Sequence, residues 1–404
     1  MEPPNRRAIF RAIAIASVSL ILTLGCTRFP EGSSATDGRS CIEKFDPATD
    51  YFAEKAKFEF AENISVEYRK SYKVVTVRRP SENGSLEHYV LLQCGAPRPV
   101  LTGDLANAPI VSVPITSMFS DSATHMPLLV ELGHVDVLTG INAARYVTTE
   151  PVLDRIRQGK VVEYAPNYVI NPELVISKAP SILMVGGGTL DEYKTIRKAG
   201  IAIVVNPEWE EGTALGRAEW LKYMALFLNE EGKAQRSFDV IRDRYTALRA
   251  RTRSIPERDR PRVMTGVASR GMFEVSAGAS YVSRLIADAG GTYIWSDNTS
   301  KGVMTVDLEA QIARASSADF WINGREWKSL KAMLAEEPRY REFKPVRQGS
   351  VWLYDRLVNA EGAYDYWSRG VTRPDLILAD LIKIFHPELA TEHEFVWYKQ
   401  VPAE

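Results

Sequence analysis

The stretch TALGRAEWLKYMALFLNEEGKAQRSFDVIRDRYTALRARTRS, residues 213–254, decides the fold. Its apolar residues recur every three or four positions, which places them on one stripe of a helix and charged residues on the other side. They are Leu221, Met224, Leu228, Phe238, Ile241, Tyr245 and Leu248. The break at Asn229–Gly232 predicts a short helix followed by one of about 20 residues, which at 1.5 Å per residue is about 30 Å long. A helix of that length can join two lobes.

Short apolar runs alternate with helical stretches on both sides of this segment, which predicts parallel sheets. Before it we expect strands at Ile110–Thr116, Val135–Ile141, Val161–Tyr164, Ser181–Val185 and Ile201–Asn206, and helices near Ala123–Leu132, Pro151–Arg157, Pro172–Ser177 and Leu190–Lys198. After it we expect strands at Arg262–Ala268, Asp319–Asn323 and Val351–Tyr354, and helices near Tyr281–Ala289, Leu308–Ala315, Ser329–Ala335 and Pro374–Phe385. Asn171 and Asp307 should cap two of these helices. The predicted fold class is α/β, with two Rossmann-like lobes joined by a single long α-helix.

The first 25 residues are typical of an export signal. Three arginines precede an uncharged run from Ala12 to Gly25, which is short for a membrane span. The run ends in LTLGC, which resembles the bacterial lipobox, although Thr23 stands where Leu is commoner. We therefore expect Cys26 to be lipidated and the protein to be exported and membrane-anchored on the periplasmic or cell-surface face. Ordinary cleavage and an uncleaved anchor are the alternatives, and the arginine pair also allows twin-arginine export.

Two cysteines, Cys41 and Cys94, follow Cys26. In an exported protein two such thiols most simply form one disulfide, although they could also stay unpaired. Between them, Val, Tyr and Thr residues alternate with polar ones on both sides of Asn83-Gly84, which indicates an antiparallel hairpin. We expect this hairpin, at residues 60–95, to be a β extension of the first lobe.

These signals divide the chain into five segments. We expect a signal peptide at 1–25, a flexible tether at 26–41, a first lobe at 42–212, the connecting helical segment at 213–254 and a second lobe at 255–404.

The sequence contains no G-x-S-x-G elbow, Walker loop or H-E-x-x-H motif, so we predict no catalytic residues. Its five histidines are scattered, with no i, i+4 pair, so we predict neither a metal site nor a cofactor. A formal net charge of −1 argues against a nucleic-acid binder. Gly186-Gly187-Gly188, between a strand and a helix, could hold an anion or simply form a tight turn.

Aromatic and arginine residues gather at or just beyond the expected strand ends. They are Tyr164, Tyr168, Trp209, Arg270, Phe273, Tyr293, Trp295, Arg325, Arg356, Tyr364, Tyr366 and Trp367. Because ligands of open α/β sheets bind outside the carboxyl ends of the strands, such residues would suit a large, partly apolar, anionic or metal-chelate ligand. Core packing is the alternative role for each ring.

Several segments carry a family resemblance. They include VPITSMFSDSATHMPLLVELGHVDVLTGI (113–141), TGVASRGMFEVSAGASYVSRLIADAGG (265–291) and RPDLILADLIKIFHPEL (373–389), of which the last is quite specific. From about residue 110 to 388 the chain resembles substrate-binding lipoproteins of bacterial ABC importers, of the helical-backbone class that serves ferric siderophores, cobalamin and haem. The hairpin at 60–95 departs from the smallest members of that class.

The resemblance implies a monomeric, non-enzymatic receptor that binds its ligand between the lobes, with only a small hinge motion. The ligand-facing residues it implies are Ser122 and Thr124 in the first lobe, and Arg270–Phe273 and Arg356, Asn359, Tyr364 and Trp367 in the second. It also implies docking on the ABC permease, which works with its ATPase, through one acidic residue on each lobe. These are Glu309 and, among Glu150, Asp154 and Glu163, preferably Asp154. Glu309 would also suit the first turn of its helix.

The ligand itself stays open at this point. Arg270, Arg325 and Arg356 favour an anionic ferric siderophore, because guanidinium groups pair with its oxygens. Cobalamin is an alternative, as is haem, for which Tyr164 or Tyr168 could be an axial ligand. An exported enzyme or a partner-binding lipoprotein on the same scaffold would be functions of other classes.

Overall fold

The computed structural model describes residues 40–269, 272–324 and 326–404. The expected signal peptide, Cys26 and most of the expected tether lie outside these ranges, as do Arg270 and Arg325. Within them, no helix combines the length and the apolar character that crossing a membrane requires.

The first lobe is built on a parallel sheet of five strands in the order β7-β6-β5-β8-β9. The strands are β5 (Met118–Ser120), β6 (Leu138–Ile141), β7 (Val162–Glu163), β8 (Ile182–Val185) and β9 (Ala202–Val205). The helices of this lobe are α1 (His125–Leu132), α2 (Glu150–Arg157), α3 (Pro172–Lys178) and α4 (Lys194–Lys198). From β5 the chain adds β6 and β7 on one side and then β8 and β9 on the other. The direction of the connections changes between β5 and β8, so a crevice forms between the carboxyl ends of these two strands.

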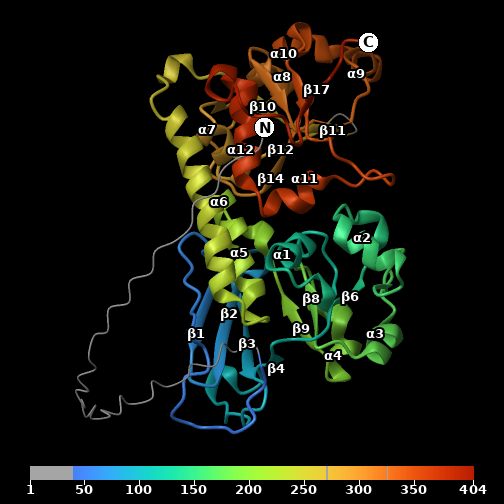
Figure 1. Ribbon diagram of the computed structural model, residues 1–404. Helices are drawn as coiled ribbons and strands as arrows, with labels where there is room; N and C mark the ends of the chain where they lie inside the picture. Colours follow the sequence, from blue (N-terminus) through green and yellow to red (C-terminus); the bar gives the residue numbers. More distant parts are fainter. Residues whose placement is uncertain (1–39, 270–271, 325) are drawn as a thin grey trace, which may run out of the picture. The chain divides into compact units, whose positions relative to one another are not determined.

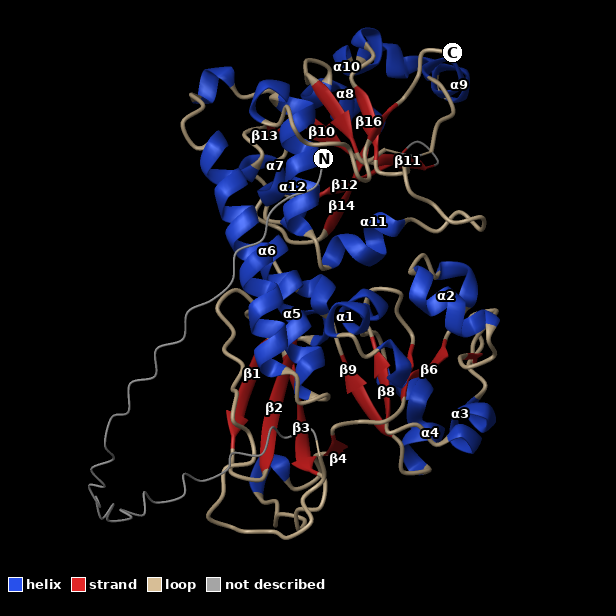
Figure 2. Cartoon of the chain, in the orientation of Figure 1, coloured by secondary structure: helices blue, strands red, loops and turns tan. Residues whose placement is uncertain are grey.

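The second lobe contains a five-stranded sheet in the order β13-β10-β15-β16-β17, parallel except for β17. Its strands are β10 (Arg262–Thr265), β13 (Thr292–Tyr293), β15 (Phe320–Ile322), β16 (Val351–Leu353) and β17 (Lys399–Gln400). Its helices are α7 (Tyr281–Asp288), α8 (Leu308–Ala315), α9 (Leu330–Glu336), α10 (Lys344–Gln348), α11 (Asp365–Ser368) and α12 (Pro374–Phe385). Figure 2 shows helices around both parallel sheets.

A small antiparallel sheet adds to the second lobe in the order β11-β12-β14. Its strands are β11 (Val267–Ser269), β12 (Met272–Ser276) and β14 (Val303–Asp307). The strand predicted at Arg262–Ala268 is therefore divided at Gly266, whose φ of +128° is a conformation that L side chains rarely adopt. This sheet was not predicted from the sequence.

Helices α5 (Ala214–Leu226) and α6 (Glu231–Thr252) connect the lobes, with α6 running from the first lobe to the second (Figure 1). The predicted break is confirmed at Asn229, which has a positive φ of 54°. The prediction of a single apolar stripe is wrong for α5, because every residue of that helix is buried. The fold is therefore α/β, with two lobes joined by one long helix.

The β extension is a four-stranded sheet in the order β1-β2-β3-β4. Its strands are β1 (Ile64–Tyr68), β2 (Tyr72–Arg79), β3 (Ser85–Gln93) and β4 (Ile110–Val113). The hairpin is confirmed, with Asn83 and Gly84 at positive φ. The strand predicted at Ile110–Thr116 is wrong as the opening strand of the parallel sheet, because β4 pairs with β3 instead. Pro114 has no N–H to continue that ladder, and β5 opens the parallel sheet.

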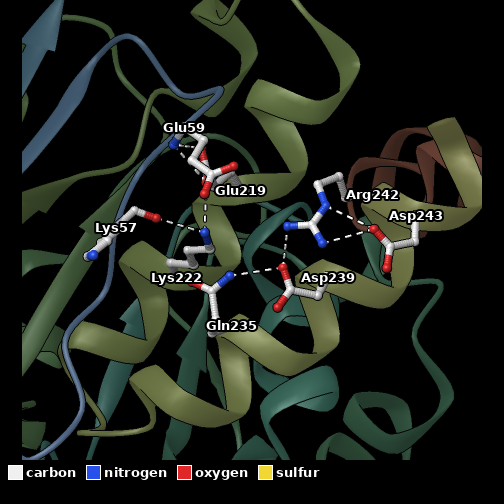
Figure 3. A network of polar contacts seen from close by, with 8 residues as sticks. All are labelled: Lys57, Glu59, Glu219, Lys222, Gln235, Asp239, Arg242 and Asp243. Carbon is white, nitrogen blue, oxygen red and sulfur yellow. Dashed lines mark hydrogen bonds and ion pairs between the residues drawn. The ribbon is translucent and has the colours of Figure 1, made fainter.

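Buried charges fasten the segment before β1 to α5 (Figure 3). The Glu219 carboxylate accepts hydrogen bonds from the three main-chain amides of residues 59–61 at 2.7–3.0 Å. Lys222 Nζ pairs with Glu219 Oε1 at 2.8 Å and donates to the Lys57 carbonyl at 2.7 Å. Both side chains are fully buried, and a buried charge is costly unless it is paired. Each charge here is neutralised by the other and by main-chain groups.

A second buried cation holds β2 to the break between α5 and α6. Lys73 Nζ lies 2.5 Å from Glu231 Oε1, 2.7 Å from Asn229 Oδ1 and 2.6 Å from the Leu226 carbonyl. It therefore binds the last turn of α5 and the first residue of α6 together. The helix break that the sequence predicts is stabilised by the β extension.

Cys41 and Cys94 form a disulfide with a Cα–Cα distance of 4.7 Å, the pairing that we expected from the sequence. It joins the first described residues to the end of β3.

Candidate functional site

Asp121 lies at the crevice of the first lobe, directly after β5. Its Oδ1 accepts a hydrogen bond from the Gly186 amide at 2.7 Å, and its Oδ2 accepts one from the Tyr193 hydroxyl at 3.0 Å. Its carbonyl accepts one from Asn142 Nδ2 at 2.6 Å. Burial raises the pKa of the Asp121 carboxyl to about 7. One residue therefore ties together the loops that follow β5, β6 and β8.

The next residues are the predicted ligand contacts Ser122 and Thr124. Both are half-buried, and their hydroxyl oxygens lie 2.9 Å apart. His125, which opens α1, is fully buried, and its Nδ1 is 2.9 Å from the Ser120 hydroxyl. Burial lowers the pKa of His125 to about 4, so the ring is neutral near pH 7. His125 supports the loop rather than facing the crevice.

Trp209, another predicted ligand contact, follows β9. Its Nε1 donates to the Gly186 carbonyl at 2.7 Å, and half of its surface is exposed. A Cβ on Gly187, where φ is +129°, would lie 3.5 Å from that Nε1. The Gly186 amide is already bound by Asp121, so the triple glycine forms a tight, cross-linked turn. Trp209 thus offers an exposed ring held by main-chain groups.

Beneath this edge, Glu208 and Arg217 form a buried pair that the sequence did not reveal. Arg217 Nη2 lies 3.5 Å from Glu208 Oε1, and its guanidinium lies 4.6 Å from the centre of the Tyr281 ring in the second lobe. Burial raises the pKa of the Glu208 carboxyl. In the sequence Arg217 looks like an ordinary charged helix residue, so no local signal could have found it.

Hydrogen bonds join the two lobes across the cleft. Thr148 Oγ1 donates to Asp365 Oδ1 at 3.1 Å. Ser368 Oγ lies 3.4 Å from Thr149 Oγ1 and donates to the Ala123 carbonyl at 3.2 Å. These contacts place α11 of the second lobe against the start of α1.

Beside these contacts is a cavity of about 580 Å³ that residues of both lobes line. Its first-lobe residues are Pro127, Val130, Glu131, Thr148, Thr149, Glu150, Pro151 and Leu153. Its second-lobe residues are Leu357, Val358, Asn359, Asp365, Arg369, Thr372 and Arg373. Its wall mixes apolar side chains with charges of both signs.

Asn359 lines both this cavity and a second one of about 510 Å³, as does Leu153. Its Nδ2 donates to the Arg145 carbonyl at 2.8 Å and to the Val147 carbonyl at 3.0 Å. The second cavity is lined by Ala144, Arg145, Val147, Leu153, Glu163, Pro166, Asn359, Ala360 and Glu361. Asn359, a predicted ligand residue, therefore bridges the lobes between the two cavities.

Tyr168 lies beside the second cavity, close to Arg145. It is 75% exposed and has a positive φ of 61°. The Arg145 guanidinium lies 5.1 Å from the Tyr168 ring and 5.3 Å from the Tyr146 ring, so it contacts both. These two rings and the guanidinium form a cluster at the edge of the first lobe, of which only Tyr168 was predicted from the sequence.

The predicted second-lobe residues divide into exposed and buried ones. Tyr364 and Trp367 pack around Tyr354, with ring centres 5.4 Å away in each case, and Trp367 is 40% exposed. Arg356 is exposed. Phe273 is fully buried against Trp321, so it belongs to the core rather than to the cleft.

Tyr164, predicted at a ligand-binding loop of the first lobe, is also a core residue. It is 1% exposed and stacks on Phe119 with ring centres 5.5 Å apart. The core-packing role that the sequence left open for each ring applies to Tyr164 and Phe273. Tyr293 is buried as well, and Trp295 packs under Arg314.

The carboxylates expected to dock on a permease are exposed, and arginines lie beside them. Asp154 and Glu150, both on α2, pair with Arg157. Glu309 lies in the first turn of α8 and pairs with Arg339 at 2.9 Å. Glu163, the third first-lobe candidate, accepts a hydrogen bond from the Ala144 amide at 2.8 Å.

Across the described ranges, no three His, Cys, Asp or Glu side chains lie close enough together to hold a metal ion.

Comparisons with known proteins bear on this arrangement. The model of the periplasmic binding protein family matches residues 122–356, which is more than half of the chain. An uncharacterized lipoprotein of Methanocaldococcus jannaschii is 27% identical over 294 residues, covering 70% of this chain and 68% of that protein.

Solved structures show the same fold. A periplasmic binding protein of Veillonella parvula aligns with a TM-score of 0.54 at 14% identity, covering 80% of this chain and 98% of that one. Helicobacter pylori CeuE in a Ni–His complex aligns with a TM-score of 0.55 at 12% identity, covering 79% and 90%. The two lobes, the connecting helix and the family match agree, and the chain belongs to the periplasmic binding protein family, whose members bind substrates rather than transform them.

Proposed function

We propose that this protein is the extracytoplasmic substrate-binding component of an ABC importer, and that it captures a ferric siderophore between its lobes and delivers it to the permease. The observation that carries the proposal is the cavity of about 580 Å³, lined by both lobes and bordered by hydrogen bonds between them. Small-molecule sites commonly occupy about 300–1,000 Å³ and often lie at domain interfaces.

The chemistry of the cleft supports a metal chelate. Arg369 and Arg373 bring guanidinium groups to the cavity wall, where they pair with Asp365 and Asp375. Trp209, Tyr168 and Trp367 offer exposed rings outside the residues that line this cavity. Rings and guanidinium groups together suit a partly aromatic, anionic ligand. The structural neighbour CeuE in its Ni–His complex is consistent with a metal-containing ligand on this fold. Ser122, Thr124, Asn359 and Tyr364 complete the proposed contacts, as do Arg270, Arg325 and Arg356.

Delivery would use one exposed carboxylate on each lobe. We propose Glu309 on α8 and Asp154 on α2, both of which are exposed at helix surfaces. Anchoring would use Cys26 in the LTLGC motif, and the name of the archaeal relative as a lipoprotein supports this assignment.

The test is a fluorescence titration of the full-length protein, purified in detergent, with one ligand class at a time. The panel contains a ferric hydroxamate, a ferric catecholate, a ferric citrate-type chelate, cobalamin and haem, each with its metal-free form where one exists. Saturable quenching by one ferric chelate below about 1 µM, without conversion of the ligand, is the expected result. Quenching by cobalamin or haem alone would replace the siderophore by that ligand. Flat titrations of folded protein across the panel would overturn the proposal.

A further inference from the structure

We propose that the turn of the β extension positions the ligand-binding loops of the first lobe, so that residues outside the parallel sheet of that lobe set ligand affinity. The residues that act are Arg79 and Ser81, which we call the clasp. The inference rests on the proposed function, because it takes Trp209 as a ligand contact. It assigns a role to a segment that the sequence identified only as an addition to the fold.

Arg79, the last residue of β2, reaches the glycine turn after β8. Its side chain is 6% exposed, and Nη2 donates a hydrogen bond to the Gly188 carbonyl. Glu87 and Glu82 lie 3.6 and 3.7 Å from its guanidinium nitrogens and balance its charge. A buried guanidinium needs such partners, so its position is strongly specified. Arg79 therefore holds the far end of the glycine turn.

Ser81 reaches the neighbouring loop, which follows β9. Its amide donates to Glu210 Oε2 at 2.9 Å and its hydroxyl donates to Glu210 Oε1 at 2.7 Å, so both carboxylate oxygens are engaged. Glu210 directly follows Trp209 in a short 3₁₀ helix. The second half of the clasp therefore fixes the segment that carries the exposed indole.

Trp209 links the two loops that the clasp holds. Its Nε1 donates to the Gly186 carbonyl, in the same turn that Arg79 binds at Gly188. The Gly186 amide donates a hydrogen bond to Asp121 Oδ1. The glycine turn is thus tied at Gly186 from within the lobe and at Gly188 from the extension. A ring that is ordered before binding loses less conformational entropy when a ligand covers it, which strengthens binding.

The clasp is separate from the contacts by which the extension stabilises the protein. Lys73, near the start of β2, fastens the strand to the helix break, and six residues later Arg79 ends it. At about 3.3 Å per residue the two side chains emerge about 20 Å apart along the strand. Loss of the clasp should therefore loosen the loops and leave the fold intact.

The experiment compares Arg79→Gln and Ser81→Ala with Arg78→Gln in the full-length protein in detergent. Arg78 is the adjacent residue on the same strand, and it is exposed. Two measurements need no ligand. The first is acrylamide quenching of Trp209 fluorescence, obtained by subtracting the signal of a Trp209→Phe version of each variant. The second is the hydrogen-exchange rate of residues 186–190 and 208–211. The third is titration with the ferric chelate that the wild-type protein binds.

We expect both clasp variants to raise the Trp209 quenching constant at least twofold, to speed exchange in both loops, and to weaken chelate binding about tenfold. Arg78→Gln should match the wild type in all three, and Arg79→Lys, which restores a donor, should recover part of the loss. Unchanged quenching and exchange in Arg79→Gln and Ser81→Ala would overturn the inference. So would loosened loops with undiminished affinity.

Two further outcomes are separable. If Arg79→Gln fails to fold, Ser81→Ala and Glu210→Gln test the same clasp through an exposed contact, and unchanged loops in those variants overturn it. If the wild-type protein binds nothing in the panel, the proposed function fails. The quenching and exchange measurements then still decide whether the clasp orders Trp209.

Discussion

Asn359 of the second lobe donates a hydrogen bond from its Nδ2 to the main-chain carbonyl of Arg145 in the first lobe, at 2.8 Å. The same nitrogen donates to the Val147 carbonyl. Its Oδ1 meanwhile accepts from the amides of Glu361 and Ala363, which shapes the turn that carries it. The Asn359 side chain therefore stabilises its own turn through Oδ1 and joins the two lobes through Nδ2.

Asn359→Asp should separate these tasks. A carboxylate still accepts the two turn hydrogen bonds, but it cannot donate to the carbonyls of Arg145 and Val147 and is repelled by them. We expect ligand dissociation to become about tenfold faster, which corresponds to about 1.4 kcal/mol or one to two hydrogen bonds. Stopped-flow fluorescence measures the rate, and small-angle scattering should show a larger radius of gyration.

Glu361→Gln, at an exposed position in the same turn, is the matched control and should behave as the wild type. Equal dissociation rates and equal scattering for Asn359→Asp and the wild type would show that this contact does not hold the lobes together.

Glu309→Arg should abolish transport while leaving ligand affinity intact, because Glu309 is exposed on α8 and does not line either cavity between the lobes. Asp154→Arg should act in the same way on the first lobe. Uptake of labelled chelate into cells and titration of the purified variants check the two halves of this prediction. Glu173→Arg is the control, since Glu173 is also an exposed first-turn carboxylate, on α3. Loss of chelate binding in Glu309→Arg would disprove its assignment to docking.

Local signals in the sequence were sufficient for much of the fold. Asn171 and Asp307 cap their helices, as predicted, with side-chain oxygens 3.0 and 2.6 Å from the amides of Leu174 and Ala310. Such caps depend on residues three positions apart, so they can be predicted from the sequence. The apolar spacing around residues 213–254 likewise predicted both connecting helices and the break between them.

Contacts between distant residues could not be predicted in this way. Glu219 looks like a solvent-facing charge until residues 59–61, about 160 positions earlier, supply its amide donors. Phe273 lies three residues after an arginine, at an expected strand end, yet the β11-β12-β14 sheet places it in the core. Strand pairing and charge burial are tertiary properties, and residue spacing alone does not encode them.

Reduction of the Cys41–Cys94 disulfide should lower the free energy of unfolding by about 2–4 kcal/mol, because the bond closes a long loop in the unfolded chain. The two residues are 53 positions apart. Neither residue lines the cavities between the lobes, so chelate affinity should be unchanged. Urea unfolding with and without reductant measures the effect, and the double variant Cys41→Ser/Cys94→Ser should reproduce it. Identical unfolding midpoints would contradict the prediction.

Lys73→Met should lower the free energy of unfolding by about 3–5 kcal/mol, because it leaves the Glu231 carboxylate buried without its cation. Adding Glu231→Gln should recover part of the loss, since the remaining side chain is neutral. Lys70→Met, an exposed lysine in the turn before β2, is the control. Urea denaturation followed by circular dichroism gives the comparison. A Lys73→Met variant as stable as Lys70→Met would mean that the pair contributes no net stability.

Asp121 and His125 should make opposite contributions to stability as pH changes. Burial raises the pKa of Asp121 from 3.8 to about 7, so the folded protein holds a proton that the unfolded chain releases. Its contribution to stability is fully present below about pH 3.8 and is lost as pH rises through 7. Burial lowers the pKa of His125 from 6.5 to about 4. The contribution of His125 is present above about pH 6.5 and is lost as pH falls through 4.

Because the two windows nearly coincide, the contributions should largely cancel in the wild-type protein, and removing one should expose the other. Relative to wild type, the free energy of unfolding of Asp121→Asn should rise with pH between about 4 and 7, and that of His125→Asn should fall between about 4 and 6.5. One exchanged proton gives a slope of at most about 1.4 kcal/mol per pH unit. Urea unfolding at half-unit steps from pH 4 to 8 measures both slopes, with the exposed Asp191→Asn as a control that should follow the wild type. Parallel curves of unfolding free energy against pH for all four proteins would show that neither group exchanges its proton on unfolding in this range. Slopes of the same sign for Asp121→Asn and His125→Asn would show that one of the two pKa shifts has the opposite direction.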